Sequence, residues 1–204
     1  EIETTSIEAC SVSIQRQGVE PITGGIRMNG LFEAVDSAVH EVLSKLRARF
    51  EDRAEKLAVD AVGFSTFAMN VIAVDENGKL IPVDQKSNED NPTTIGISYA
   101  CNAPNVHAQC QRLRQDLGQD GMDKLYQATG APLHSAYALP QLLALYNQEN
   151  SLTNLQPNHR WQSIAGYCLA RWTNKLHLPI TYSEASWTGL LNIRFCTYEE
   201  SATQ

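Results

Sequence analysis

The segment between residues 59 and 83 limits the fold of this chain more than any other part of its sequence. Its two apolar runs, Val59–Phe67 and Val71–Val74, are typical of buried strands. Asp75-Glu76-Asn77-Gly78 follows as a turn, because Asn-Gly supplies the positive φ values that a tight hairpin needs. Leu80–Val83 is then expected to return as the second strand of the hairpin. The chain is therefore predicted to contain a sheet.

Helical periodicity dominates much of the remaining sequence. Asn29 is expected to cap the first helix, with Glu33 in its first turn, where the helix dipole favours an anion. His40 falls on the polar side of this helix, so we expect it to be exposed. The apolar side chains recur at a spacing of three and four residues: Leu31, Val35, Ala38, Val39, Val42, Leu46 and Phe50.

Three further helices are predicted towards the C-terminus. One is expected to open at Asn102-Ala103-Pro104 and to end at Gly118. Its apolar inner face is predicted to consist of Val106, Cys110, Leu113 and Leu117. The other two are expected at about residues 138–147 and 160–172.

Strands and loops are predicted for the rest of the chain. Cys10–Arg16 alternates as a strand does and is followed by a loop rich in Gly and Pro. Gln85–Thr94 is the most polar stretch and is expected to be a mobile surface loop. Ile180–Tyr182 is predicted as a short strand, and Glu184–Leu191 as a short helix or turn in which Ser186 and Thr188 form capping or cross-linking bonds. The order of the elements indicates an α/β fold.

Composition argues against several classes of protein. Lys and Arg number 16 against 23 Asp and Glu, and a net charge of −7 disfavours general affinity for nucleic acid or anionic lipid. No apolar run approaches the ~20 residues of a membrane helix, so no membrane insertion is expected. The five cysteines form neither a C-x-x-C pair nor a metal cluster with the histidines. We therefore expect no metal site, and free thiols in the cytoplasm or another reducing compartment.

Four stretches have the spacing of motifs known from one family: Ala61–Phe67 with Val74–Lys79, Ser98–Asn102, Thr129–Tyr137 and Ile180–Asn192. In this order they resemble motifs of the N-terminal domain of the FGGY carbohydrate kinases. The first is similar to the G-x-S strand with its V-D-x-x-G-x-P hairpin, and the second stands at the place of T-W-x-D-x-R. The third is similar to T-G-x-x-x-x-x-x-Y. The fourth is the most specific and is similar to S-x-A-S-x-T-x-L-x-D/N.

The resemblance implies a fold and a reaction. The fold would be the actin-like, ribonuclease-H-like domain, in which a central mixed sheet carries helices on both faces, and residues 1–204 would be part of that N-terminal domain. Two such domains clamp ATP, Mg²⁺ and the carbohydrate, and a phosphoryl group passes to a hydroxyl of a sugar, polyol or sugar acid.

The resemblance also implies which residues face the carbohydrate: Thr66, Phe67, Tyr99, Asn102 and Tyr137. Each has a local alternative. Phe67 equally suits a core position and Thr66 a bond to the backbone, Asn102 suits a helix N-cap, and Tyr137 suits packing of its ring against the next helix.

The sequence departs from the family at the reacting groups. Neither the D-x-G-T phosphate hairpin nor the catalytic aspartate of the family has a match here, so no catalytic residue is assigned. ATP and Mg²⁺ are expected of the intact kinase, and neither cofactor nor turnover of the 204 residues alone.

An alternative hypothesis is a non-catalytic, kinase-like subunit with a structural or interaction role, and a third is a passive sugar-binding module. Ala68 and Met69 stand where many relatives have residues that reach the sugar hydroxyls, and Asn102 and Pro104 replace the aspartate and arginine of the second motif. These substitutions favour the non-catalytic subunit. The expected partner is the second kinase domain or another protein subunit, covering a face with Phe67, Met69 and Tyr99.

Overall fold

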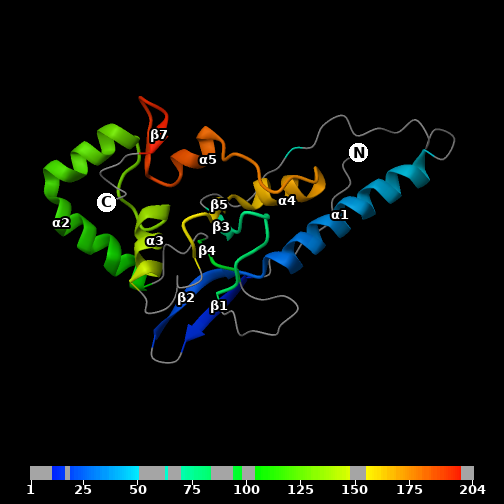
Figure 1. Ribbon diagram of the computed structural model, residues 1–204, viewed down its shortest axis with the longest axis horizontal. Helices are drawn as coiled ribbons and strands as arrows, with labels where there is room; N and C mark the ends of the chain where they lie inside the picture. The colour runs from blue at the N-terminus through cyan, green and yellow to red at the C-terminus, as the bar shows by residue number, and fades with distance from the viewer. Residues whose placement is uncertain are drawn as a thin grey trace.

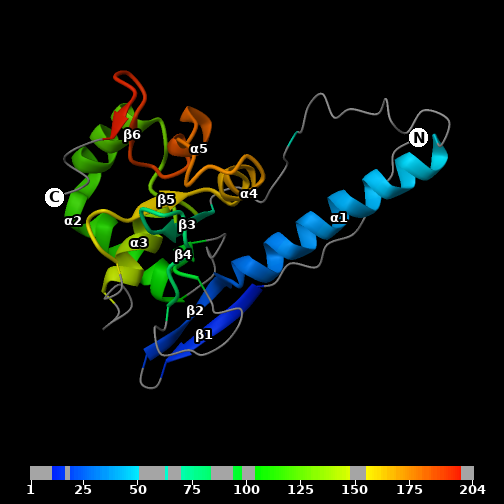
Figure 2. The ribbon, with the colours of Figure 1, turned by 45° about the vertical axis from the view of Figure 1, so that its right-hand side comes forward.

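The computed structural model describes residues 11–16, 19–50, 63, 70–83, 94–97, 104–147 and 155–198. The N-terminal elements are β1 (Ser11–Arg16), β2 (Val19–Ile26) and α1 (Met28–Arg49), and they are followed by β3 (Val71–Val74) and β4 (Gly96–Ile97). The remaining elements are α2 (Pro104–Thr129), α3 (Ala138–Tyr146), β5 (Arg160–Gln162), α4 (Ile164–Trp172), α5 (Tyr182–Ser186), β6 (Leu191–Asn192) and β7 (Thr197–Tyr198). Short strands lie at the centre, and α1 extends away from them (Figures 1 and 2).

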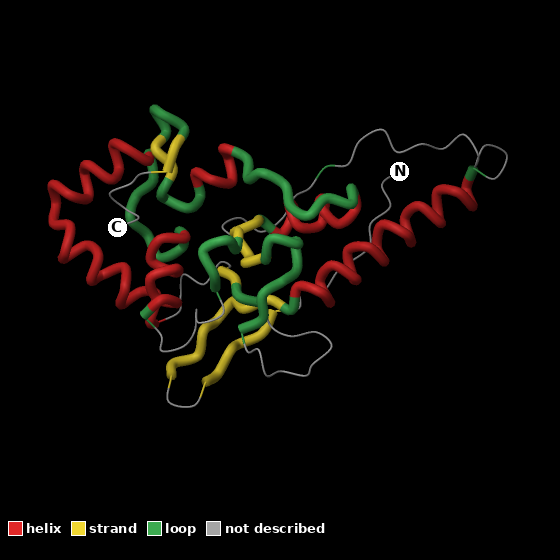
Figure 3. Tube along the Cα trace, in the orientation of Figure 1, coloured by secondary structure: helices red, strands yellow, loops and turns green. Residues whose placement is uncertain are grey.

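A three-stranded sheet of order β4-β3-β5 forms the centre, and both of its pairings are antiparallel. The side chains of β3 alternate between the two faces of the sheet. Ile72 and Val74 pack with the start of α1 and with α4, in a cluster with Met28, Leu31, Ile164, Tyr167 and Cys168. Val71 packs with α3, and Ala73 packs with the return of the hairpin and Ile95. Helices therefore contact both faces of β3, and Figure 3 shows them around the central strands.

The turn after β3 confirms the turn predicted from Asn77-Gly78, with Gly78 alone supplying a positive φ. Gly78 has φ +74° and the Asp75 carboxylate accepts bonds from the backbone N–H groups of Asn77 and Lys79, each at 2.8 Å. Leu80 returns to bridge Val74, and Pro82 bridges Thr94, but these are isolated bridges, so residues 80–83 do not form the predicted second strand. The strand β1, the strand β3, the helix α3 and the exposed position of His40 also agree with the sequence.

Three predictions about the N-terminal half are wrong. Residues 19–26 are a strand that pairs with β1, not a loop, because an edge hairpin tolerates Pro21 and the glycines. The helix α1 begins at Met28, so Asn29 is not its cap and Glu33 lies beyond its first turn. Burial of Met28 against β3 and α4 accounts for the earlier start. Thr94, the last residue of the predicted surface loop, is instead buried and bridges Pro82.

Three further corrections concern the C-terminal half. Gly118, with φ 59° and ψ −175°, breaks the helix as expected, but the chain turns helical again up to Thr129, and Leu117 is exposed. Residues 160–162 form β5 instead of a first helical turn, because Ser163 caps α4 by accepting a bond from Gly166 N–H at 2.9 Å. Residues 180–182 form no strand, because Thr181 and Glu184 make a capping box that starts α5.

Parts of the prediction lie outside the described residues. These are the strand at 59–67 except for Gly63, with Thr66 and Phe67, and the segment that contains Tyr99 and Asn102. Every strand pairing in the described part is antiparallel, so the central mixed sheet of an actin-like domain stays a prediction. In the described part of the chain, no helix combines the length and the apolar character needed to cross a membrane.

Candidate functional site

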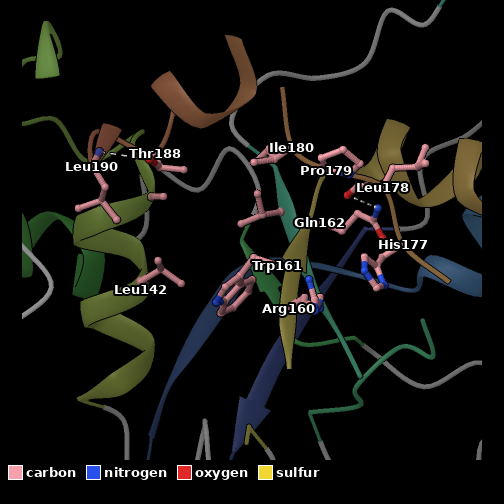
Figure 4. A pocket seen from close by; sticks show the side chains of 12 residues that line it. Leu142, Arg160, Trp161, Gln162, His177, Leu178, Pro179, Ile180, Thr188 and Leu190 are labelled. Atoms are coloured by element: carbon pink, nitrogen blue, oxygen red, sulfur yellow. Dashed lines mark hydrogen bonds between the residues drawn. The ribbon is translucent and has the colours of Figure 1, made fainter. Parts of the chain in front are cut away.

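A pocket of about 650 Å³ lies between β5, the start of α3 and the segment from residue 177 to residue 190 (Figure 4). This volume is within the range of small-molecule sites. Its wall is largely apolar and includes Val71, Ala138, Leu142, Ile180 and Leu190. Five side chains with polar atoms line it as well, those of Arg160, Trp161, Gln162, His177 and Thr188.

The pairing of β5 directs its backbone and side chains to this pocket. Ala73 donates its N–H to Ile95 and accepts a bond from Ile81 N–H, so its backbone groups point away from β5. Its neighbours in β3 therefore bond to Arg160 and Gln162, and the backbone N–H and C=O of Trp161 point to the other edge of β5. In the described sheet β5 is an edge strand.

Two buried polar atoms in the pocket wall have no hydrogen-bond partner in the part of the chain that the structure describes. Gln162 is 3% exposed, and its Nε2 donates to the Leu178 carbonyl at 3.1 Å, but its Oε1 accepts no bond. The Nδ1 atom of His177 is the second such atom. In Figure 4 the side chains of Arg160, Gln162 and His177 lie on one side of β5, and Trp161 lies on the other. Buried polar groups in proteins are nearly always bonded, so this pocket has the character of a binding site.

Local bonds hold the opposite wall of the pocket in place. The Thr188 hydroxyl donates to the Ala185 carbonyl at 2.6 Å and accepts from Leu190 N–H at 3.2 Å. The Ser186 hydroxyl donates to the Ser183 carbonyl at 2.7 Å. These bonds confirm the cross-linking role predicted for Ser186 and Thr188. They fix the turn that presents Thr188 and Leu190 to the pocket.

Tyr137 lies beside this pocket and does not line it. It is half-buried at the N-cap of α3, with its ring edge-on to that of His134 at 6.4 Å between centroids. Gly189 lies against Tyr137, and Leu139, two residues after Tyr137, donates its backbone N–H to the Thr188 carbonyl at 3.3 Å. Of the five residues predicted to face a carbohydrate, Tyr137 alone is in the described part.

The shifted pKa values lie away from the pocket. Burial raises the pKa of Cys110, although Arg114 opposes the shift, and it raises the pKa of Tyr167. Burial also raises the pKa of Cys168 to about 11. Thiols in this state are protonated at neutral pH and are poor nucleophiles. No three His, Cys, Asp or Glu side chains of the described residues gather as metal ligands would.

A second pocket of about 390 Å³ lies between the hairpin after β3 and α4. Lys79 and Arg171 are in its wall. Within the described ranges, no polar side-chain atom of this wall is buried without a hydrogen-bond partner. The larger pocket is therefore the stronger candidate.

The sequence did not point to Arg160, Gln162 and His177. Residues 160–172 have helical spacing of apolar side chains, and this pattern concealed the strand β5. Ser163, a good N-cap residue three positions before Gly166, was the signal that a helix begins only after Gln162. No sequence pattern indicates that His177 lies near β5.

Solved structures of two carbohydrate kinases resemble this chain. They are the gluconate kinase from Lactobacillus acidophilus and a ligand-bound xylulose kinase from the same organism. Each match has a TM-score of 0.61 at 19% sequence identity and covers 94% of this chain. The chain therefore has a carbohydrate-kinase-like fold. It spans about a third of these kinases, since each match covers 32% of the kinase chain.

The sequence comparisons gave no match. No protein-family model matches this sequence, and no curated protein does. The likeness to the two kinases is thus a likeness of fold.

Proposed function

We propose that this chain is the N-terminal-domain part of an ATP-dependent carbohydrate kinase of the FGGY type. The observation that carries the proposal is the match of 94% of the chain to both a gluconate kinase and a xylulose kinase. The motif resemblance supports it independently, because it runs through the hairpin after β3 and the turn from Thr188 to Leu190, and both are ordered by local hydrogen bonds.

In this proposal the chain supplies the carbohydrate side of the site. Tyr137, with Thr66, Phe67, Tyr99 and Asn102, contacts the sugar, polyol or sugar acid, and the rest of the intact enzyme supplies ATP and Mg²⁺ contacts. Phosphoryl transfer depends on positioned charges around the phosphates and on a base that takes the hydroxyl proton. We assign neither to a described residue, so the 204 residues alone should not turn over ATP.

The test uses the native polypeptide that contains this sequence. Purified from its source, it should release ADP with at least one sugar, polyol or sugar acid in a coupled assay, whereas the 204-residue chain should not exceed background. Tyr137→Phe should raise KM for the carbohydrate. The matched control is Tyr146→Phe, since Tyr146 is the last residue of α3, whose N-cap is Tyr137, and is 73% exposed. An intact polypeptide that is inactive with every sugar, polyol and sugar acid tested would refute the kinase proposal.

The second candidate is a non-catalytic, kinase-like subunit that binds another protein. One observation favours it: Ile193 and Phe195, in the turn between β6 and β7, are 50% and 74% exposed. Large apolar side chains at the surface are typical of contact sites between proteins. An intact polypeptide without kinase activity that co-purifies with a partner, and loses that partner on Phe195→Ser, would favour this function.

A further inference from the structure

The pocket beside β5 contains a hydrogen-bond acceptor that nothing in the described part of the chain satisfies. Gln162 is held by its Nε2 donor bond to the Leu178 carbonyl, so its Oε1 is fixed in place, and no described residue donates to it. A carbonyl oxygen can only accept. A ligand that completes this group must bring a donor, and a hydroxyl is the simplest one.

A second polar group in the same wall also suits a hydrogen bond with a ligand. The Nδ1 atom of His177 is buried and has no hydrogen-bond partner among the residues that the structure describes. An imidazole nitrogen accepts from or donates to a hydroxyl according to its tautomer. The side chains of His177 and Gln162 lie on the same side of β5 (Figure 4). Two adjacent buried groups that both suit hydroxyls indicate a polyhydroxylated ligand.

Charge narrows the class of ligand further. Arg160 lines the same side of the pocket, and its side chain is exposed. Among the described residues that line the pocket there is no Asp or Glu, so this part of the wall carries the positive charge of Arg160 without a carboxylate to balance it. An arginine guanidinium binds a carboxylate through two parallel hydrogen bonds, a geometry that a neutral hydroxyl does not match.

The apolar part of the wall fits the carbon skeleton of such a ligand. Trp161, Leu142 and Leu190 line the pocket opposite the polar side chains. The C–H groups of a sugar pack on surfaces of this kind, because their burial removes apolar area from water. The pocket thus combines an apolar wall with polar groups on one side.

We propose that this pocket binds a sugar acid, whose hydroxyls bond to Gln162 and His177 and whose carboxylate bonds to Arg160. The inference rests on the proposed function only for the carbohydrate nature of the substrate. It does not use the contacts proposed for Tyr137, which lies beside this pocket and does not line it. It selects acids over neutral sugars and polyols. It assigns Arg160 as the residue that determines this specificity.

The experiment compares D-gluconate with D-glucitol, which share a six-carbon polyol chain and differ in one carboxylate. Calorimetry on the purified 204-residue chain should show D-gluconate binding at least about tenfold more tightly. Arg160→Gln should lower the affinity for D-gluconate to that for D-glucitol and leave D-glucitol unchanged. Arg112→Gln, which removes an exposed arginine of α2 outside the pocket, is the matched control and should have no effect.

Two results would overturn the inference. One is equal binding of the two probes, or no binding of either, by the unmodified chain. The other is a preference for D-gluconate that survives in Arg160→Gln, with circular dichroism showing the variant folded. The comparison of D-gluconate with D-glucitol on the unmodified chain remains decisive even if the Arg160→Gln variant fails to fold.

The outcomes also separate this inference from the kinase proposal. An intact polypeptide that phosphorylates neutral sugars alone, with no gluconate preference in the chain, would leave the kinase proposal standing and refute the sugar-acid site. A chain that prefers D-gluconate within an intact polypeptide without kinase activity would support the site and refute the kinase.

Discussion

Asn70 joins two segments of the core that are far apart in the sequence. It is 1% exposed, directly before β3, and its Oδ1 accepts a bond from the backbone N–H of Ile164 at 2.8 Å. Ile164 is the first residue of α4 and is itself 3% exposed. The N–H groups of a first helical turn have no partner inside the helix, so this side chain satisfies one that water does not reach.

Asn70→Ala should therefore destabilise the chain by about 2–4 kcal/mol. A buried N–H left without an acceptor costs about 1–3 kcal/mol, and the lost packing of the amide adds to it. For a chain of this size the midpoint of thermal unfolding should fall by roughly 5–15 °C. The substitution should affect the stability of the fold and not ligand binding directly, because Asn70 is not in the wall of the pocket.

Urea unfolding followed by circular dichroism measures the effect, provided that the denaturant dependence of the two proteins is the same. Ser163→Ala is the matched control, since it removes the cap of the same helix, where Ser163 accepts from Gly166 N–H. It should cost only about 1 kcal/mol. If Asn70→Ala cost no more than Ser163→Ala, the argument that a buried N–H depends on Asn70 would be refuted.

Three further predictions concern the core and the hairpin. Met28→Ala should cost about 2–5 kcal/mol in urea unfolding, because Met28 is fully buried, whereas Val39→Ala at an exposed position should cost less than about 0.5 kcal/mol. Gly78→Ala should cost more than about 2 kcal/mol in the same assay, because φ is +74° there and a Cβ would collide with the Leu176 carbonyl; an unchanged midpoint would contradict this. The free energy of unfolding should fall between about pH 9 and 11, because the unfolded Cys168 thiol loses its proton while the buried one, with its pKa of about 11, keeps it; Cys168→Ala should flatten this part of the pH profile.

Local bonds explain which parts of the fold the sequence predicts well. The hairpin after β3 depends on Gly78 and on a carboxylate that bonds to N–H groups two and four residues along the chain, all within one turn. Such interactions involve neighbouring residues, so their residue types reveal them. The turn that presents Thr188 was predictable for the same reason.

Tertiary pairing explains what the sequence did not predict. Trp161, Ile164, Cys168 and Trp172 recur at helical spacing, so the pattern favours one helix over the whole segment. The strand β5 exists because Arg160, Trp161 and Gln162 pair with β3, about ninety residues earlier in the chain. A strand of three residues is too short for its alternation to show in a sequence.

The same error concealed the candidate site. Residues two apart on a helix point about 200° apart around its axis, so a helix over 160–172 would have placed Arg160 and Gln162 on different faces. On a strand, residues two apart share a face, and β5 brings both side chains to one side of the pocket (Figure 4). The Gln162 bond to Leu178 then draws the loop with His177 against that face. The site therefore depends on two long-range contacts, the pairing of β5 with β3 and the docking of this loop, and neither is encoded in a local motif.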